Sequence, residues 1–342
     1  MGLAYVGRVI DLAPIKEADR IVLATVVCGA GGKWLGVVPK ENMSVGASVR
    51  VFLQDAVVPD TVEFEFMKAR RNRVKMCRFK GVPSECLIMP YTGTEDIGTD
   101  ITDNEHVSKY EKPIPAALVG EIEGLFPSYI PKTDEPNFQT VPHLVEALRG
   151  HEFVATEKCD GTSGTFFRRT DPKTGVVSFG VCSRNLQMKN PSESVSHRPT
   201  VYWDMAEKYG LLNILRNMEK GPEYDLALQF EIVGPGIQKN PMCLQNHEIR
   251  LFNIRSIATR TYWNHYSLTA FAEAYKLPVP RVIDTGQGFN YTEDEMRKLA
   301  EGCYLDTKNQ REGLVFRPVY EQRVGICKER LSFKVINLLY KD

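Results

Sequence analysis

The apolar residues of this chain are gathered in short runs separated by turn residues, and this patterning constrains the fold more than any other feature. In the first hundred residues, five such runs are rich in β-branched residues or alternate between apolar and polar residues, which is typical of strands. They cover residues 5–15, 20–29, 33–40, 48–59 and 73–81. Five short strands with turns between them suit a small closed barrel, so we expect an OB-fold β-barrel here.

The last of these runs belongs to a strongly basic stretch. Residues 68–80 hold seven Lys or Arg side chains and no acidic one. Strand alternation predicts that Arg73 and Lys75 lie on one side and the apolar residues beside them on the other. A basic outer face suits a phosphate backbone, although a solvated loop whose charges only serve solubility is the alternative. The candidate nucleic-acid contacts are Arg70, Arg71, Arg73, Lys75, Arg78 and Lys80.

The composition of the whole chain excludes several classes of protein. With 43 basic and 43 acidic residues among 342, the net charge is zero, so a nucleic-acid surface must be a local patch. The fractions of 43% apolar and 25% charged residues indicate a globular chain of two domains, or three. The eight cysteines form no C-x-x-C pair and have no zinc-finger spacing, so we expect reduced thiols. Without a signal-peptide pattern or a transmembrane run, we expect a cytoplasmic or nuclear protein with no membrane contact.

The composition changes after the five runs. Residues 95–136 are acidic and then Pro-rich, with no sustained strand or helix pattern. Beyond them, strand-like runs are mixed with helical stretches such as 200–218 and 267–277, which predicts an α+β domain with antiparallel strands. The expected organisation is an OB-fold nucleic-acid-binding domain at 1–112, a linker at 113–125 and a second domain at 126–342.

A lysine occupies an unusual position in the stretch EKCDGTS, residues 157–163, directly after an apolar run. Burial disfavours a protonated amine, so we expect the pKa of Lys158 to fall, and a neutral amine is a nucleophile. The Asp160-Gly161 turn follows, and Thr162 and Ser163 offer hydroxyls to an anion. Taken alone, a lysine before an Asp-Gly turn is more often a solvated hairpin residue.

The residues after Lys158 decide between these interpretations, because polar side chains recur beside or inside later apolar runs. A charged residue inside an apolar strand needs a partner, so several of them in one domain predict a shared polar site. They are Arg184 in CSRN, Glu231 in QFEIVG, Glu312 in REGLVF and Lys334 in LSFKVIN, while Phe252 in LFNI offers a flat apolar surface.

This series resembles the nucleotidyltransferase motifs of the covalent lysyl-AMP superfamily, which includes ATP-dependent polynucleotide ligases and mRNA-capping guanylyltransferases. The resemblance covers residues 126–338 and implies an antiparallel, ATP-grasp-like ligase fold. Six motifs occur in the expected order: Glu157-Lys158-Cys159-Asp160-Gly161, Ser183-Arg184-Asn185, Glu231, Phe252-Asn253-Ile254, Glu312-Gly313 and Lys334.

The order of the domains narrows the resemblance. DNA ligases and capping enzymes of this superfamily carry their OB domain after the last motif, whereas here eight residues follow Lys334 and the barrel-like domain precedes Lys158. With the segments FPSYIPKTDEPNFQ and EIVGPGIQ, the chain is similar to nick-sealing RNA ligases of the Deinococcus and Naegleria type. This implies a monomeric ATP-dependent RNA ligase in RNA repair, which joins 5′-phosphate and 3′-hydroxyl ends of RNA or RNA-containing duplexes. The alternatives are a DNA ligase, a guanylyltransferase, or an RNA-binding protein with a dead nucleotidyl site.

The resemblance also implies residue roles. Lys158 would attack the α-phosphorus of ATP to form lysyl-AMP, the AMP would pass to a 5′-phosphate, and a 3′-hydroxyl would displace it. Asp160, Glu231 and Glu312 would lie near Mg²⁺ or Mn²⁺, through its waters, and the metal would help Lys158 lose its proton. Lys334 and Arg184 would contact phosphate oxygens, and Phe252 would stack on adenine. The further expected ATP contacts are Glu157, Gly161, Lys328 and the segment from Lys132 to Gln139.

Two positions depart from the superfamily pattern. Many relatives have a second lysine two residues before the one at Lys334, where this chain has Ser332. We expect Ser332 itself, Lys328 or Arg330 to supply the missing phosphate contact. The companion of the third motif often has Asp after its Phe, where this chain has Asn253, so no metal ligand is expected there.

Overall fold

The computed structural model describes residues 2–111, 120–197, 200–219, 221–325 and 329–340. The chain divides into two compact units, Met1–Pro113 with Asn137–His143 and Ile114–Pro136 with Leu144–Asp342. Part of the linker expected at 113–125 lies outside the described residues. Across those that are described, no helix has the length and apolar composition to cross a membrane, and all seven cysteines are free thiols.

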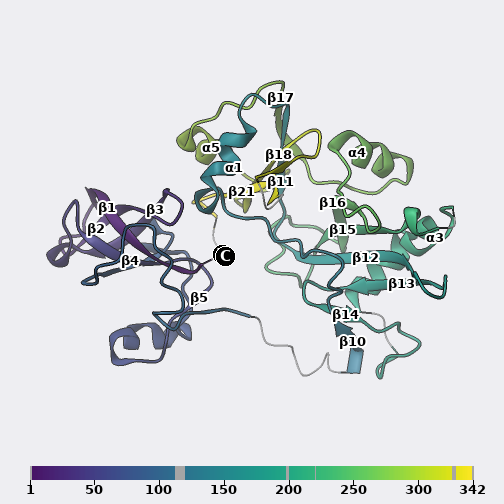
Figure 1. Cartoon of the computed structure of the whole chain (residues 1–342), viewed down its shortest axis with the longest axis horizontal. Helices are drawn as coiled ribbons and strands as arrows, with labels where there is room; N and C mark the ends of the chain where they lie inside the picture. The colour runs from purple at the N-terminus through teal and green to yellow at the C-terminus, as the bar shows by residue number, and fades with distance from the viewer. Residues whose placement is uncertain (1, 112–119, 198–199, 220, 326–328, 341–342) are drawn as a thin grey trace. The chain divides into compact units, whose positions relative to one another are not determined.

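The first unit is built on a five-stranded antiparallel sheet in the order β3-β2-β1-β4-β8 (Figure 1). Inward-facing residues such as Val26 and Trp34 fill the core on one side of the sheet. The N–H of Glu85 donates to the carbonyl of Leu35 at 2.7 Å, so the approach to β8 is tied to the edge strand β3 and the sheet is curled. The strands are β1 (Ala4–Pro14), β2 (Ile21–Cys28), β3 (Gly32–Pro39), β4 (Ser48–Phe52) and β8 (Leu87–Pro90).

The prediction of a sheet strand at 73–81 is wrong, although the four earlier runs do form β1 to β4. Only β6 (Cys77–Phe79) forms there, and it pairs with β7 (Val82–Ser84) in a separate hairpin. The basic stretch begins in the 3₁₀ helix η2 (Val62–Arg70). Phe64 and Met67, three residues apart, are buried on one side of η2, and Phe64 packs against Phe52, so a helical spacing replaces strand alternation.

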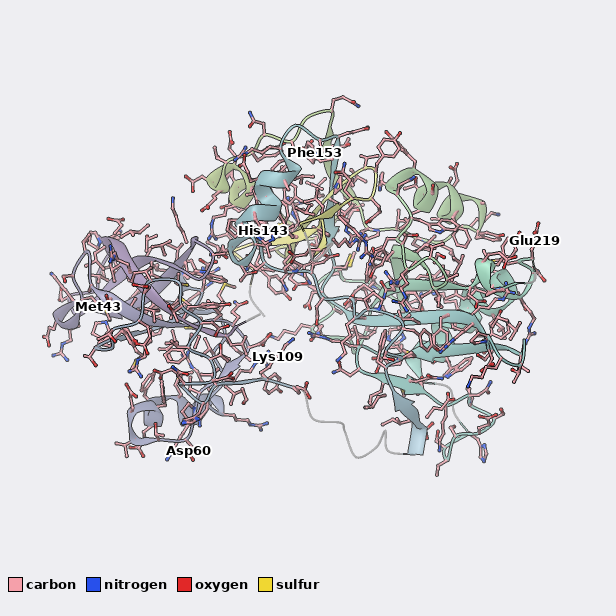
Figure 2. The ribbon with its side chains drawn as sticks, viewed as in Figure 1. Met43, Asp60, Lys109, His143, Phe153 and Glu219 are labelled. Carbon is pink, nitrogen blue, oxygen red and sulfur yellow. The ribbon has the colours of Figure 1, made fainter. Side chains whose placement is uncertain are left out.

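The remaining elements of the first unit are short. They are η1 (Lys40–Asn42), β5 (Ala56–Val57), β9 (Ser108–Lys109) and η4 (Phe138–Thr140). β5 pairs with β9, and Lys109 of β9 is labelled in Figure 2. A fold of this kind matches the expected strand content of the first domain, while the OB-fold assignment stays a prediction.

The second unit holds a six-stranded antiparallel sheet in the order β10-β14-β13-β12-β15-β16 (Figure 1). Its core contains Phe166, Leu228 and Phe230 from the sheet and Leu215 and Leu268 from the helices that pack on it. The strands are β10 (Ile122–Leu125), β12 (Thr162–Thr170), β13 (Val177–Cys182), β14 (Leu186–Met188), β15 (Leu226–Val233) and β16 (Glu248–Ser256). The helices are α2 (Val201–Lys208), α3 (Leu211–Arg216), η5 (Pro222–Tyr224) and α4 (His265–Ala274).

A four-stranded sheet completes the second unit, in the order β17-β11-β18-β21 (Figure 1). One face is filled by aromatic rings: Phe316 stacks on Phe333 with centroids 5.6 Å apart, and Phe153, labelled in Figure 2, lies edge-on to Phe289. The strands are β11 (Phe153–Lys158), β17 (Val282–Gly286), β18 (Gly313–Pro318) and β21 (Phe333–Ile336), with the hairpin β19 (Arg323–Val324) and β20 (Glu329–Arg330). The helices are α1 (Pro142–Leu148) and α5 (Glu293–Ala300).

The chain is therefore a strand-rich mixture of α and β structure, and the prediction of antiparallel strands is confirmed. The sequence did not indicate β10, β14, β17 or α5. For α5 a signal was present, because Thr292 and Glu295 form a capping box at its start.

Candidate active site

Lys158 stands where the chain leaves one sheet of the second unit for the other. β11 ends at Lys158, the turn Cys159–Gly161 follows, and β12 begins at Thr162 in the six-stranded sheet. Within its own sheet Lys158 pairs in register with Gly313, so Glu312 is its neighbour on the next strand. The Lys158 Nζ donates to Glu312 Oε2 at 2.7 Å. Lys158 of the first motif and Glu312 of the fourth motif therefore form an ion pair at the point where the chain passes between the two sheets.

Gly161 allows the turn to pass close to β15. A Cβ atom on Gly161 would lie 2.3 Å from the carbonyl oxygen of Ile232 and 2.8 Å from Cγ of Glu231. Its backbone N–H instead bonds to the Glu231 carboxyl. Because only glycine fits this approach, Gly161 brings Glu231 of the six-stranded sheet up to the lysine turn.

Three carboxylates determine the charge state of Lys158. Burial alone lowers the pKa of its amine, but the negative charges of Glu312, Glu231 and Asp160 outweigh burial and raise this pKa above its ordinary value. The prediction that the pKa of Lys158 falls is therefore wrong for the protein without bound metal. Burial first, and then the crowding of carboxylates, raises the pKa of Glu231 to about 8.

The donor set of this cluster fits a divalent cation. Asp160, Glu231 and Glu312 supply carboxylate oxygens, the ligands that Mg²⁺ and Mn²⁺ prefer. The negative charges of Glu312 and Asp160 add to the effect of burial on the pKa of Glu231, so negative charge is gathered at this cluster. In the described ranges, no three His, Cys, Asp or Glu side chains are grouped closely enough to hold a metal ion directly. The cluster is consistent with a cation held partly through its waters.

Lys334 lies on the same sheet face as Lys158. Lys334 pairs in register with Val315, and Val315 pairs with Thr156, so the three side chains share a face. Thr156 and Lys158 are two residues apart on one strand and also share that face. The fifth motif thus follows the first and fourth across a single face of the four-stranded sheet.

The segment before α1 contacts the second motif. The Lys132 Nζ donates to Asn185 Oδ1 at 2.9 Å, and Arg184 forms an ion pair with Asp134 at 2.7 Å. The Arg184 side chain is 53% exposed, so this ion pair is weakly held and open to exchange with a ligand. The structure thereby brings together Lys132 and Arg184, two of the residues expected to contact ATP.

Glu135 and Arg317 form a buried pair that the sequence analysis missed. Glu135 Oε1 accepts from Arg317 Nη2 at 2.7 Å and lies 3.5 Å from Arg330 Nη1. These arginines hold the pKa of Glu135 below its usual range, against burial, which raises it. Arg317 Nε also donates to Ser332 Oγ at 3.1 Å, so a guanidinium lies at the position where many relatives have a lysine. The signal was available, because Arg317 is a charged residue inside the apolar run GLVFRP.

Two tyrosines also escaped the sequence analysis. The Tyr304 hydroxyl donates to the carbonyl of Lys158 and accepts the N–H groups of Asp160 and Glu312, each at 3.1 Å. It therefore locks the lysine turn to the start of β18. The Tyr340 hydroxyl donates to Asp160 Oδ2. Neither tyrosine lies in a local pattern that indicates a polar site.

Comparison with known proteins agrees with this geometry. A sequence model of the RNA ligase family matches residues 151–336, which is more than half of the chain. This chain belongs to the RNA ligase family.

Solved structures of Naegleria gruberi RNA ligase are similar over nearly the whole chain. A mutant in the apo state has 25% identity and a TM-score of 0.77, covering 99% of this chain and 97% of that chain. A mutant with AMP and Mn has 26% identity and a TM-score of 0.77, covering 98% and 96%. The enzyme with PPi has 26% identity and a TM-score of 0.75, covering 98% and 97%. No curated protein matches the sequence.

In this member of the RNA ligase family, two of the expected ATP contacts, Phe252 and Glu157, have different surroundings. Phe252 lines a small cavity with Thr156 and Arg317, and its carbonyl accepts from Arg317 Nη1 at 2.8 Å. Glu157 is buried and its Oε1 atom has no hydrogen-bond partner in the described part of the protein. Burial raises the pKa of Glu157 despite the charges of nearby arginines.

Gln139 and Lys328 are the remaining expected ATP contacts. Gln139 belongs to the first unit, where its side-chain amide donates to the carbonyl of Lys33. Lys328 lies outside the described residues. The roles assigned to both stay predictions.

The basic stretch of this RNA ligase family member is only partly available to a ligand. Arg73 donates to Asp55 Oδ1 and lies over the ring of Tyr110 at 3.8 Å, so its charge is used within the first unit. Arg78 donates to the carbonyl of Gly81 at 3.0 Å and is half-buried. The exposed members of the set are Arg70, Arg71, Lys75 and Lys80.

Proposed function

We propose that this protein is an ATP-dependent RNA ligase that works through a lysyl-AMP intermediate on Lys158. The observation that carries the proposal is the placement of the Lys158 amine 2.7 Å from Glu312 Oε2, in the field of Glu231 and Asp160. Membership of the RNA ligase family and the similarity to ligase structures solved with ATP and Mn, with AMP and Mn and with PPi support it.

The reaction begins with the Lys158 amine. Its proton is held between Nζ and Glu312 Oε2, and loss of that proton frees the lone pair for in-line attack on the α-phosphorus of ATP. An N–P bond forms while the bond from the α-phosphorus to the bridging oxygen breaks, and pyrophosphate leaves. The 5′-phosphate of an RNA end then attacks lysyl-AMP and takes the AMP, restoring the amine. A 3′-hydroxyl finally attacks the activated 5′-phosphate and releases AMP.

The carboxylates prepare Lys158 for this attack only when their charge is compensated. A divalent cation held by Asp160, Glu231 and Glu312 would lower the pKa of the amine and neutralise phosphate oxygens. Tyr304 and Tyr340 fix the positions of the lysine turn and of the Asp160 carboxylate. Pre-set geometry of this kind is the main contribution a protein makes to phosphoryl transfer.

Further residues supply ATP contacts in this proposal. Lys334 and Arg184 bind phosphate oxygens, and Arg317 beside Ser332 supplies the charge that many relatives take from a second lysine. Phe252 stacks on adenine, and Lys132 and Glu157 contribute to the nucleotide pocket. Phe252 is only partly buried, which leaves part of its ring open to a base and supports the stacking role.

For the first unit we propose an OB-fold that binds the RNA duplex around a nick. The strand order β3-β2-β1-β4-β8 and the link from Glu85 to Leu35 support the assignment, because they almost close a five-stranded barrel. The exposed basic residues Arg70, Arg71, Lys75 and Lys80 supply phosphate contacts.

The test is labelling with α-³²P-ATP and a divalent metal, followed by a chase with nicked duplexes whose 3′-hydroxyl strand is RNA or DNA. We expect a labelled band that disappears in Lys158→Ala and that chases into the RNA-ended nick. Labelling by GTP would indicate a guanylyltransferase, and a chase only into the DNA-ended nick would indicate a DNA ligase. No band, from protein freed of bound AMP, would leave an RNA-binding protein.

A further inference from the structure

A second polar cavity lies in the second unit, and it shares Lys132 and Ser332 with the surroundings of the proposed nucleotide site. It has a volume of about 330 Å³ and is large enough for a phosphate group with its waters. Its wall holds the cations Lys132, Arg255, Arg323 and Arg330, the carboxylates Asp134, Glu135 and Glu329, and also Tyr262 and Ser332. We call it the Arg255 pocket.

Arg255 is the unusual member of this pocket. It lies near the end of β16 and only 7% of its surface is exposed. Its Nε atom has no hydrogen-bond partner, and no carboxylate in the described ranges forms an ion pair with it. Its guanidinium lies 5.0 Å from the centre of the Tyr262 ring. A buried cation without a counter-ion is costly, so its retention at a cavity wall points to an anionic ligand.

The neighbouring arginines do not balance the charge of Arg255. Arg330 lies over the same Tyr262 ring at 3.8 Å, but its own charge is balanced by Glu321 and Glu135. Arg323 also lines the cavity and is exposed. Burial, with the charges of Arg323 and Arg330, lowers the pKa of Arg255. The excess positive charge is therefore concentrated at Arg255.

The position of the pocket indicates the source of the anion. Ser332 in its wall lies two residues before Lys334, and Lys132 in its wall is bonded to Asn185 of the second motif. The pocket is thus continuous with the face that carries the proposed chemistry. An RNA strand whose end is held there has further phosphates along its backbone.

We propose that the Arg255 pocket binds a backbone phosphate of the RNA strand that is joined. This inference rests on the proposed ligase function. The Arg255 guanidinium donates through Nε to a phosphate oxygen, and Arg323 at the rim adds a second contact. Guanidinium groups suit this ligand because their planar donors match two phosphate oxygens.

The experiment measures binding of a nicked RNA duplex to Arg255→Gln and Arg323→Gln at several KCl concentrations. Arg260→Gln is the matched control, because Arg260 is an exposed arginine in the turn after β16 and does not line the pocket. We expect the Kd of the first two variants to rise by about tenfold and the slope of log K against log salt to shrink by about 0.9, the value for one lost phosphate contact. The control should match the wild type.

Two results would overturn the inference. The first is an unchanged Kd and salt slope in both variants. The second is unchanged RNA binding together with weaker inhibition of ATP labelling by sodium pyrophosphate, which would assign the pocket to a nucleotide phosphate. Melting curves show whether each variant is folded. If Arg255→Gln is unfolded, Arg323→Gln provides the test, because Arg323 is exposed. If the wild type binds RNA but is not labelled by ATP, the proposed function fails and the salt slopes still decide the pocket.

Discussion

The hydroxyl of Tyr304 accepts the backbone N–H of Glu312 at 3.1 Å, and the same oxygen donates to the carbonyl of Lys158. One buried side chain thus holds the end of β11 at Lys158 next to Glu312, which directly precedes β18. The register of β11 and β18 aligns these strands, and Tyr304 holds the turn beyond their ends together with Tyr340 and Gln238.

Tyr304→Phe should remove the hydroxyl that links the Lys158 carbonyl to the Glu312 N–H. The substitution leaves the N–H groups of Asp160 and Glu312 without an acceptor in a buried setting, which costs about 1–3 kcal/mol of unfolding free energy. Because the residue positions the reacting groups, we expect the rate of labelling by ATP to fall by about tenfold or more while the KM for ATP changes little. Tyr266→Phe is the control, since Tyr266 is an exposed tyrosine bonded to Glu152. Equal rates for both variants would remove the positioning role.

The stability of the metal-free protein should depend on the ionisation of Glu231. Its pKa is raised from 4.5 to about 8, so its stabilising contribution is complete below about pH 4.5 and is lost as the pH rises through about 8. In EDTA, we expect the free energy of unfolding to fall over this window by up to about 1.4 kcal/mol per pH unit. Glu231→Gln should flatten the slope, and Mg²⁺ should reduce it by favouring the ionised carboxyl. Urea unfolding at several pH values gives the measurement, and an unaltered slope in the variant would contradict it.

Glu135→Gln should destabilise the protein strongly. The change removes the carboxylate shared by Arg317 and Arg330, and because the pair with Arg317 is buried we expect a loss of about 3 kcal/mol in unfolding free energy. The lowered pKa of Glu135 means that this difference is present above about pH 4.5 and disappears as the pH falls through the lowered value. Glu146→Gln, which breaks the exposed pair with Arg149, should change stability by less than about 0.5 kcal/mol. A similar cost for both variants would show that the buried pair has no special weight.

Reversing the exposed charges of the basic stretch should separate RNA binding from labelling. In the triple variant Arg70→Glu, Arg71→Glu and Lys75→Glu, we expect labelling by ATP to persist and joining of nicked RNA to weaken, with a smaller salt slope. Arg73 is left in place, because it is bound to Asp55 and its reversal would disturb the fold. The control reverses three exposed charges of the same unit: Lys16, Arg20 and Lys40. Intact joining at physiological salt in the first triple variant would exclude this surface from RNA binding.

The differences between sequence and structure have particular physical causes. Alternation located β1 to β4 and most strands of the second unit, because the burial of one face imposes a period of two. Alternation failed to predict the structure of residues 73–81. The preceding residues form a 3₁₀ helix, in which Phe64 and Met67 are buried three residues apart and which ends inside the basic stretch. The fifth position in the sheet is occupied by β8 instead of residues 73–81. The sequence analysis also predicted the wrong direction for the pKa of Lys158, because a local pattern reveals that an amine is buried but not how many carboxylates surround it.

By itself the sequence determined which charged residues stand beside or inside apolar strands and the order in which they occur, since a charged side chain in an apolar strand is a local signal. Tertiary structure alone decided how they are held. Tyr304 reaches the carbonyl of Lys158 across 146 residues of chain, and Arg317 reaches Glu135 across 182. Contacts at such separations depend on how two sheets meet, and no pattern within a short window encodes that meeting.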